Sequence, residues 1–180
     1  MAFAKTNWDI NVDELESLSK SILHMAKRKL SSEVLDDYPE IVFRSFTNEN
    51  LLRLQSLVHA TKVVIKGVDE KIANLLSFSI STILRKSAHV GTAQWQYILP
   101  NKKSKSRDPF VEYTKKIAEI VSDIREFQSA GIKAKSKIIL GNAENMSEVP
   151  DNKIDFVLTS PPYANNYDYA DTTRLEMSFY

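Results

Sequence analysis

The residues with the clearest chemical potential are Ser160, Pro161, Pro162 and Tyr163, which directly follow a short apolar run. Two successive prolines have no backbone N–H donors and disfavour helical geometry in the residue before them, so they hold an extended turn. Their carbonyl oxygens and the Ser160 hydroxyl are then free to accept hydrogen bonds. Tyr163 adds a flat ring for stacking. This combination predicts a pocket for a planar group that carries an amine.

Two short apolar runs are expected to position this turn. Lys137–Leu140 ends at Gly141, and Ile154–Leu158 ends at Thr159 and Ser160. Both runs are rich in branched residues and bounded by turn formers, which is typical of buried parallel strands. In open α/β sheets, ligands bind at the carboxyl ends of the strands. Since two strands cannot make a stable sheet of this kind, the sequence predicts only the end of an α/β pattern, with the other strands elsewhere or absent.

The first three-quarters of the chain is predicted to be helical, because apolar residues recur there at helical spacing. The predicted helices begin near Val12, Thr47, Asp69 and Asp108. The last has the strongest start signal, an aspartate followed by Pro109 at the first helical position. Gly67 and Gly131 stand where left-handed caps are expected to close the second and fourth helices.

Composition restricts the possible function classes. The formal net charge is +1, so bulk charge does not indicate a nucleic-acid-binding protein. The sequence has no cysteine, which excludes disulfides and cysteine-based zinc sites. Its three histidines are scattered along helical segments, so no metal centre is expected. No apolar run approaches the roughly 18 residues of a membrane span, and the N-terminus lacks a secretory signal. These features predict a cytoplasmic protein.

The segment from Asp155 to Tyr163 resembles the catalytic motif of DNA methyltransferases that modify N4 of cytosine or N6 of adenine. The resemblance implies that Ser160 and the Pro161 carbonyl accept hydrogen bonds from the target amine, with Pro162 in the same catalytic turn. Tyr163 would stack on the base after it is flipped from the duplex. Serine in first place is more similar to the N4-cytosine members, since the adenine members usually carry Asp or Asn. Methylation at cytosine C5 is excluded, because that family needs a cysteine nucleophile.

The same resemblance implies S-adenosylmethionine as the methyl donor, with Asn142 and Thr159 as cofactor-binding residues. The Ile138–Asn142 segment is similar to the strand that, in this family, ends in Gly-Asp-Ala near the cofactor adenine, although Asn142 replaces the usual aspartate. The family's glycine-rich cofactor loop has no counterpart among the four glycines of this sequence. The sequence is therefore interpreted as part of such an enzyme, completed by a further segment or subunit.

The fold implied is α/β, a partial S-adenosylmethionine-dependent methyltransferase (Rossmann-like) sheet preceded by a mainly helical region. Residues 1–131 are expected to form the helical region, with a possible role in target recognition or partner docking. Residues 132–180 are expected to form the partial α/β core with the catalytic motif.

A basic segment between the third and fourth helices is the candidate contact with double-stranded DNA. It contains Lys102, Lys103, Lys105 and Arg107 and follows Trp95 and Tyr97. Lysines and arginines neutralise duplex phosphates. The alternative is a solvated loop between helices, which the balanced overall charge favours.

Together these features favour a site-specific DNA methyltransferase of the restriction-modification type, acting on N4 of cytosine. Two groups of alternatives stay open. The first comprises an N6-adenine DNA methyltransferase and enzymes with a similar pocket that act on RNA or on protein amides. The second is a catalytically inactive helical binding module or fragment that retains the turn.

Overall fold

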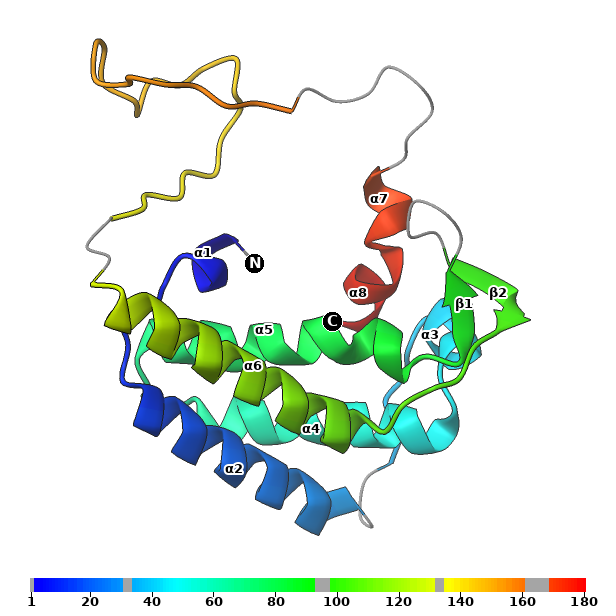
Figure 1. Ribbon diagram of the computed structural model, residues 1–180. Coiled ribbons are helices and arrows are strands. Elements are labelled where there is room, and N and C mark those ends of the chain that lie inside the picture. The colour runs from blue at the N-terminus through cyan, green and yellow to red at the C-terminus, as the bar shows by residue number, and fades with distance from the viewer. Residues whose placement is uncertain (1, 31–33, 93–97, 132–134, 161–168) are drawn as a thin grey trace.

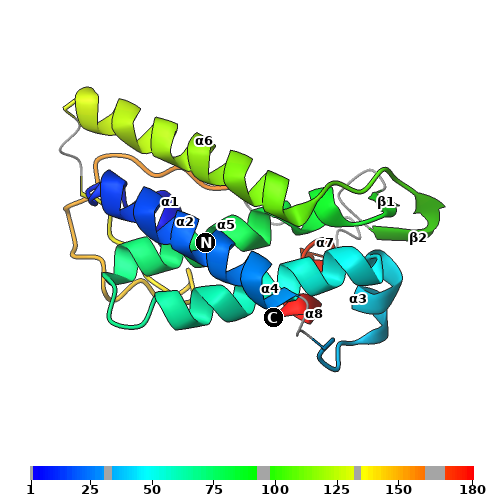
Figure 2. The ribbon, with the colours of Figure 1, turned by 90° about the horizontal axis from the view of Figure 1, so that it is seen from below.

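The computed structural model describes residues 2–30, 34–92, 98–131, 135–160 and 169–180. Four long helices make a bundle in which α2 packs on α4, α5 packs on α6, and both pairs touch each other (Figures 1 and 2). These helices are α2 (Val12–Lys29), α4 (Asn48–Val64), α5 (Glu70–Ser87) and α6 (Pro109–Ser129). The four helices expected from the sequence are confirmed.

The helices begin where a side chain can cap the first free backbone N–H groups. The Asp108 carboxylate accepts a hydrogen bond from the backbone N–H of Phe110 at 2.8 Å, with Pro109 at the first helical position. The remaining N-cap residues are Asn11, Thr47 and Asp69. Gly67 and Gly131 adopt φ values of 76° and 66°, as a left-handed turn after a helix requires.

The core lies between the four helices and follows the apolar stripes seen in the sequence. Its fully buried side chains include Leu15, Ile22, Leu51, Leu54, Leu57, Leu76, Ile80, Ile83 and Leu84. Burying side chains of this size stabilises the fold by roughly 1.5–3 kcal/mol each. The bundle is therefore a complete helical core of its own. Among the described residues, none of its helices combines the length and apolarity that crossing a bilayer requires.

Shorter elements surround the bundle. They are α1 (Ala2–Lys5), α3 (Glu40–Ser45), α7 (Tyr169–Thr172), α8 (Arg174–Phe179) and the strands β1 (Val90–Thr92) and β2 (Ile98–Lys103). The strands pair antiparallel, with Thr92 opposite Ile98, and form a hairpin between α5 and α6. The hairpin was not expected from the sequence. It is the sheet that the described residues contain, and its strands are antiparallel. The parallel strands predicted from the sequence were in another part of the chain, at residues 137–140 and 154–158.

The two apolar runs predicted as buried strands are not strands in the described residues. Residues 135–160 instead arch away from the bundle as an extended segment (Figure 1). Leu140, Phe156 and Leu158 are 102%, 78% and 87% exposed. A parallel strand needs neighbouring strands on its edges and helices on its faces, and the described residues supply neither here. The helical part of the predicted fold is confirmed, and the partial Rossmann-like sheet is not.

Candidate functional site

The turn with the strongest chemical signal lies at the end of the arching segment. Thr159 and Ser160 are both exposed. Pro161, Pro162 and Tyr163 lie outside the described residues. Ser160 therefore has its hydroxyl available to a ligand.

Asn142, expected near a cofactor, lies in the same exposed segment. Its Oδ1 accepts a hydrogen bond from the backbone N–H of Glu144 at 3.0 Å, and its Nδ2 donates to the Glu144 carboxylate, also at 3.0 Å. The amide thus stabilises a local turn, which is a common role for asparagine. In the described residues the Asn142 side chain makes these bonds within its own loop and is not brought near Thr159 by any strand.

Residues 169–180 are held firmly, in contrast to the described residues that precede the turn. Leu175 and Phe179 of α8 are 0% and 4% exposed and belong to the bundle core. Phe179 stacks on Tyr38 with ring centroids 5.5 Å apart. Met177, the other apolar residue of this helix, faces solvent. The tail after residue 168 is consequently part of the helical body.

The basic residues expected to contact nucleic acid lie on β2 of the hairpin and on the irregular segment that leads from it to α6. Lys102, Lys103, Lys105 and Arg107 are all exposed. No acidic side chain in the described ranges pairs with the three lysines, whereas Arg107 lies 3.6 Å from the Glu112 carboxylate. The structure therefore brings the four predicted residues to one end of the bundle.

Glu112, on the first turn of α6, lies close to two further cations that were not among the predicted DNA-contacting residues. Its side chain is only 3% exposed, and it lies 3.8 Å from Lys86 and 3.2 Å from Lys115, besides Arg107. One carboxylate cannot neutralise three cations, so net positive charge remains on the surface above it. The sequence could indicate only the pairing of Lys115 with Glu112, because these residues are three positions apart on one helix. Lys86 lies on a different helix, α5, so its approach to Glu112 could not be predicted from the sequence.

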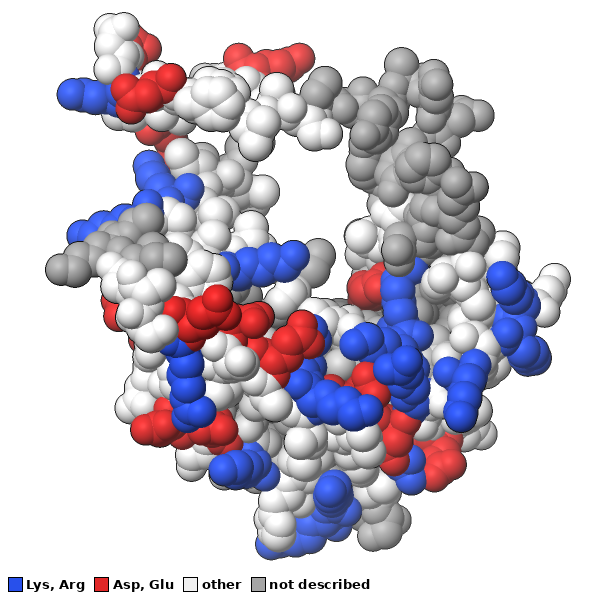
Figure 3. All heavy atoms as spheres, viewed as in Figure 1, with Lys and Arg blue, Asp and Glu red and all other residues white. Residues whose placement is uncertain are grey.

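We call the resulting patch the cationic surface. It consists of Lys86, Lys102, Lys103, Lys105, Arg107 and Lys115. Figure 3 shows Lys and Arg side chains gathered on the hairpin side of the molecule. Local positive charge of this density attracts polyanions even when the net charge of the protein is near zero.

Backbone pairing and one buried amide fix the geometry of this surface. The N–H of Arg107 donates to the carbonyl of Lys86 at 3.0 Å, which joins the exit of the hairpin to the end of α5. Asn50 of α4 is 6% exposed, and its Nδ2 donates to the carbonyls of Ser87 (2.9 Å) and Arg107 (3.0 Å). The cationic side chains therefore project from a rigid base.

His89 lies in the same region and is half-buried. Burial, and then the nearby charge of Lys103, lower the pKa of its imidazole. The ring is consequently neutral near pH 7 and adds no charge to the cationic surface. Among the residues that the structure describes, no group of three His, Asp or Glu side chains is placed to hold a metal ion.

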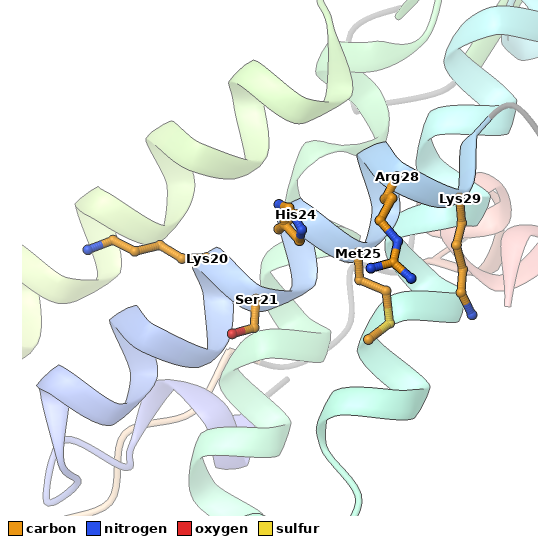
Figure 4. A pocket seen from close by; sticks show the side chains of 6 residues that line it. All are labelled: Lys20, Ser21, His24, Met25, Arg28 and Lys29. Carbon is orange, nitrogen blue, oxygen red and sulfur yellow. The ribbon is translucent and has the colours of Figure 1, made fainter.

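A pocket elsewhere on the molecule is lined by one helix alone. Figure 4 shows its side chains, with Met25, Arg28 and Lys29 pointing to one side of the last turns of α2 and Lys20 extending away from them. Neither the turn at Ser160 nor the hairpin contributes to this pocket. It is therefore separate from the candidate site.

Comparison with known proteins gives one informative match. A type II methyltransferase, M.BsoBI of Geobacillus stearothermophilus, is 40% identical to this chain over 63 residues. The similarity is to a methyltransferase. It covers 33% of this chain but only 12% of the length of M.BsoBI. No family model matches the chain, and no solved structure does. The match supports a relationship to methyltransferases at the level of the family.

Proposed function

We propose that this protein takes part in transferring a methyl group from S-adenosylmethionine to the exocyclic amine of a base in DNA, with N4 of cytosine as the preferred target, in a restriction-modification system. The partial identity to a type II methyltransferase is the observation that carries the proposal. The residues from Asp155 to Tyr163 support the amino-group reaction, and serine at position 160 supports cytosine.

In this proposal the residues of the turn orient the amine. The Ser160 hydroxyl oxygen and the Pro161 carbonyl oxygen each accept a hydrogen bond from one N–H of the amine, which aims the nitrogen lone pair away from them. Pro162 keeps the turn rigid, and Tyr163 stacks on the flipped base. Holding the nitrogen in line for direct transfer removes the need for a covalent enzyme intermediate. Acceptor oxygens at the amine also stabilise the positive charge that develops on nitrogen.

Asn142 and Thr159 do not make a cofactor site by themselves. Both are exposed, and the Asn142 amide is already bonded to Glu144. The residues present therefore do not fit S-adenosylmethionine without further protein around them, and no step of the reaction is assigned to them. Their contacts with the cofactor stay a prediction that depends on completion of the sheet.

The exposed apolar runs support completion by additional strands. Ile138, Leu140, Phe156, Val157 and Leu158 present a large apolar surface that single chains rarely leave open to water. We propose that strands of a complementing methyltransferase segment or subunit pair with these runs and bury them. Ser160 and Asn142 would then lie at the carboxyl ends of neighbouring strands, where α/β sheets bind ligands. The division into a helical region, 1–131, and a methyltransferase part, 132–180, remains part of this proposal.

The cationic surface is proposed to hold the DNA backbone. Lys102, Lys103 and Lys105 have exposed side chains without an acidic partner in the described ranges, and they lie at the end of the bundle where α7 and α8 also lie (Figures 1 and 2). Phosphate contacts set the position and orientation of a protein on a duplex but carry no sequence information. The bases that determine the recognition site are therefore read elsewhere.

The alternative of a catalytically inactive helical module has one observation in its favour. The bundle is fully packed, whereas Thr159 and Ser160 stand exposed outside it. Such a module would bind DNA or a protein partner and leave the methyl donor untouched. Cofactor binding and methyl transfer separate it from the enzyme.

The proposal is tested with the purified chain, alone and together with the complementing methyltransferase segment or subunit, by calorimetric titration with S-adenosylmethionine and by transfer of a radiolabelled methyl group to duplex DNA, followed by identification of the methylated nucleoside. We expect N4-methylcytosine, and we expect Ser160→Ala and Tyr163→Ala each to lower the transfer rate by about 100-fold or more. Ser147→Ala, an exposed serine of the same segment, is the matched control.

Each other outcome has a defined meaning. N6-methyladenine as the product would move the target base to adenine. Transfer that survives in both motif variants would remove the turn from the mechanism. Absence of cofactor binding by the chain alone would agree with a methyl-donor site that needs the complementing part, whereas absence of binding and of transfer with that part present would favour the inactive module.

A further inference from the structure

A glycine and a lysine on opposite strands of the hairpin are in close contact. Gly91, on β1, is buried. A Cβ atom added at this position would lie 2.8 Å from Cγ and 2.9 Å from Cδ of Lys102 on β2. Non-bonded carbon atoms pack at about 3.5–4.0 Å, so only glycine leaves room for the Lys102 side chain here. The aliphatic stem of Lys102 therefore lies directly on the backbone of β1.

The backbone of β1 does not itself require this glycine. The described glycines with positive φ are Gly67 and Gly131, and Gly91 is not one of them. Glycine inside a strand weakens the strand, and where it occurs it often marks a bulge or the close approach of other atoms. Both features are found at Gly91, and the atoms that approach it belong to Lys102.

Lys102 comes from a bulge in β2. Gly91 is opposite Leu99, whereas Val90, the residue before it, is opposite Lys103. Residues 100–102 consequently have no partner on β1, and pairing resumes at Lys103. Bulges change the direction in which side chains leave a strand. In this hairpin the bulge brings Lys102 across β1 and onto Gly91.

Backbone hydrogen bonds fix the hairpin to the bundle next to this bulge. The N–H of Ser104 donates to the carbonyl of His89 at 2.8 Å, and the N–H of His89 donates to the carbonyl of Ser45, the last residue of α3, at 2.9 Å. The bulge and Gly91 therefore belong to the same rigid base as the rest of the cationic surface.

The charged end of Lys102 stays available although its stem is held. The residue is exposed, as expected for a lysine that covers apolar surface with its methylene groups and keeps its ammonium group in water. The buried carboxylate of this surface, on Glu112, pairs with other cations, which are Lys86, Arg107 and Lys115.

Lys103 and Lys105 have no comparable contact with a glycine. At the other described glycines, an added Cβ would have no atom within 4 Å. A side chain that is ordered before binding loses less conformational freedom when its ligand arrives. Lys102 should therefore bind an anion more favourably than an unrestrained lysine on the same surface.

We propose that Gly91 is a positioning residue, which orders Lys102 so that its ammonium group is ready to bind a phosphate of duplex DNA. This inference rests on the proposed contact between the cationic surface and DNA. It predicts that Gly91, an uncharged and buried residue, affects duplex binding through Lys102 alone.

The test is a double-mutant cycle on the purified chain, with duplex affinity measured by fluorescence anisotropy at several salt concentrations. Gly91→Ala and Lys102→Gln are made singly and together. Gly91→Ala combined with Lys103→Gln is the first control. Gly141→Ala is the second, because Gly141 is exposed, has no positive φ and has open space where its Cβ would lie. Thermal melting and NMR relaxation of the lysine side-chain methylene groups are measured as well.

We expect Gly91→Ala to weaken duplex binding by about 2- to 10-fold at every salt concentration and to keep the salt slope, because Lys102 still reaches a phosphate but must first be ordered. Lys102→Gln loses one phosphate contact, so its slope should be shallower by about 0.9. Gly91→Ala should cause no further loss when Lys102 is already replaced, and the full loss when Lys103 is replaced. Gly141→Ala should bind like the unchanged protein.

The NMR measurement tests the contact itself, without DNA. The methylene groups of Lys102 should be more ordered than those of Lys103 and Lys105, and Gly91→Ala should abolish this difference. Equal order in the three lysines of the unchanged protein would show that Gly91 does not hold Lys102, and the inference would be wrong.

Two binding results would also overturn the inference and leave the proposed function standing. One is a loss from Gly91→Ala that is equally large with and without Lys102, together with a lower melting temperature, since Gly91 would then only support the hairpin. The other is Gly91→Ala binding as tightly as the unchanged protein. If the unchanged protein does not bind the duplex at all, the proposed DNA contact fails, and this inference fails with it.

Discussion

Replacing Lys102, Lys103 and Lys105 together by glutamine tests the cationic surface directly. These three lysines have exposed side chains and no acidic partner in the described part of the chain. Their removal should therefore leave the fold intact, because exposed charges contribute little to stability. What should change is the dependence of duplex binding on salt, since each phosphate contact releases counterions.

The expected size of the change follows from the charges present. The cationic surface has six cations, and Glu112 neutralises the equivalent of one, which leaves five. Five phosphate contacts predict a slope of log affinity against log salt of about −4.5, so binding weakens by about 500-fold between 50 and 200 mM salt. Two contacts remain in the triple variant, which predicts a slope of about −1.8 and a loss of about 12-fold over the same range.

Fluorescence anisotropy with a labelled duplex, measured at several salt concentrations, gives both slopes. Lys62→Gln combined with Lys66→Gln is the matched control, because these exposed lysines lie at the opposite end of α4 from the hairpin. The control should keep the steep slope. Equal slopes for the triple variant and the unchanged protein would refute the assignment of this surface to DNA, whatever the outcome of the methylation assay.

Other consequences can be measured on the fold and on its pH dependence. Asn50→Ala removes one buried and one part-buried hydrogen bond, so the free energy of unfolding in urea should fall by about 2 kcal/mol. Leu76→Ala leaves a cavity in the middle of the bundle, and we expect a loss of about 2–5 kcal/mol by the same method. Burial and Lys103 lower the pKa of His89, so the unfolded chain binds a proton more readily than the folded protein does. Stability should therefore drop as the pH falls through the ordinary histidine value of 6.5 toward the lowered one, and thermal melts of His89→Gln should show a weaker dependence. Glu112→Gln should destabilise the fold yet steepen the salt slope of duplex binding by about 0.9, because it frees one cation for a phosphate.

Control variants on the same elements test whether each expected change comes from the named side chain. Asn48→Ala removes an exposed asparagine of the same helix, so an equal loss of stability for Asn48→Ala and Asn50→Ala would contradict the role given to the buried amide. A shallower salt slope for Glu112→Gln would show that the carboxylate organises the cations for binding and does not compete with phosphate.

The long helices could be predicted because their signals are local. Asp108 and Pro109 specify the start of α6 through hydrogen bonds to neighbouring N–H groups, and Gly131 closes it. The hairpin was missed because Pro100 and two lysines interrupt the expected alternation of apolar residues in β2. The hairpin is joined to other elements by backbone hydrogen bonds, from the Arg107 N–H to the Lys86 carbonyl at the end of α5 and from the His89 N–H to the Ser45 carbonyl of α3, which no local pattern reveals.

The candidate site was predictable only in part, for the same reason. Lys102, Lys103, Lys105 and Arg107 form a visible run in the sequence. Lys86 joins them only because α5 and α6 pack side by side, which brings it to the buried carboxylate of α6. The strands at residues 137–140 and 154–158 were predicted from their apolar content alone. A strand forms only when neighbouring strands pair with it, and the described residues place no strand beside either run.

The exposure of the two apolar runs has a consequence for the behaviour of the chain at high concentration. Extended segments with branched apolar side chains and unpaired backbone groups act as templates for pairing between identical molecules. Residues 138–140 and 156–158 are therefore the places where copies of this protein would first aggregate. Charged residues stand beside both runs, at Lys137, Lys153 and Asp155, and charges in such positions act as gatekeepers against intermolecular strands. These charges thus oppose self-association of the chain for as long as no complementing segment or subunit covers the two runs.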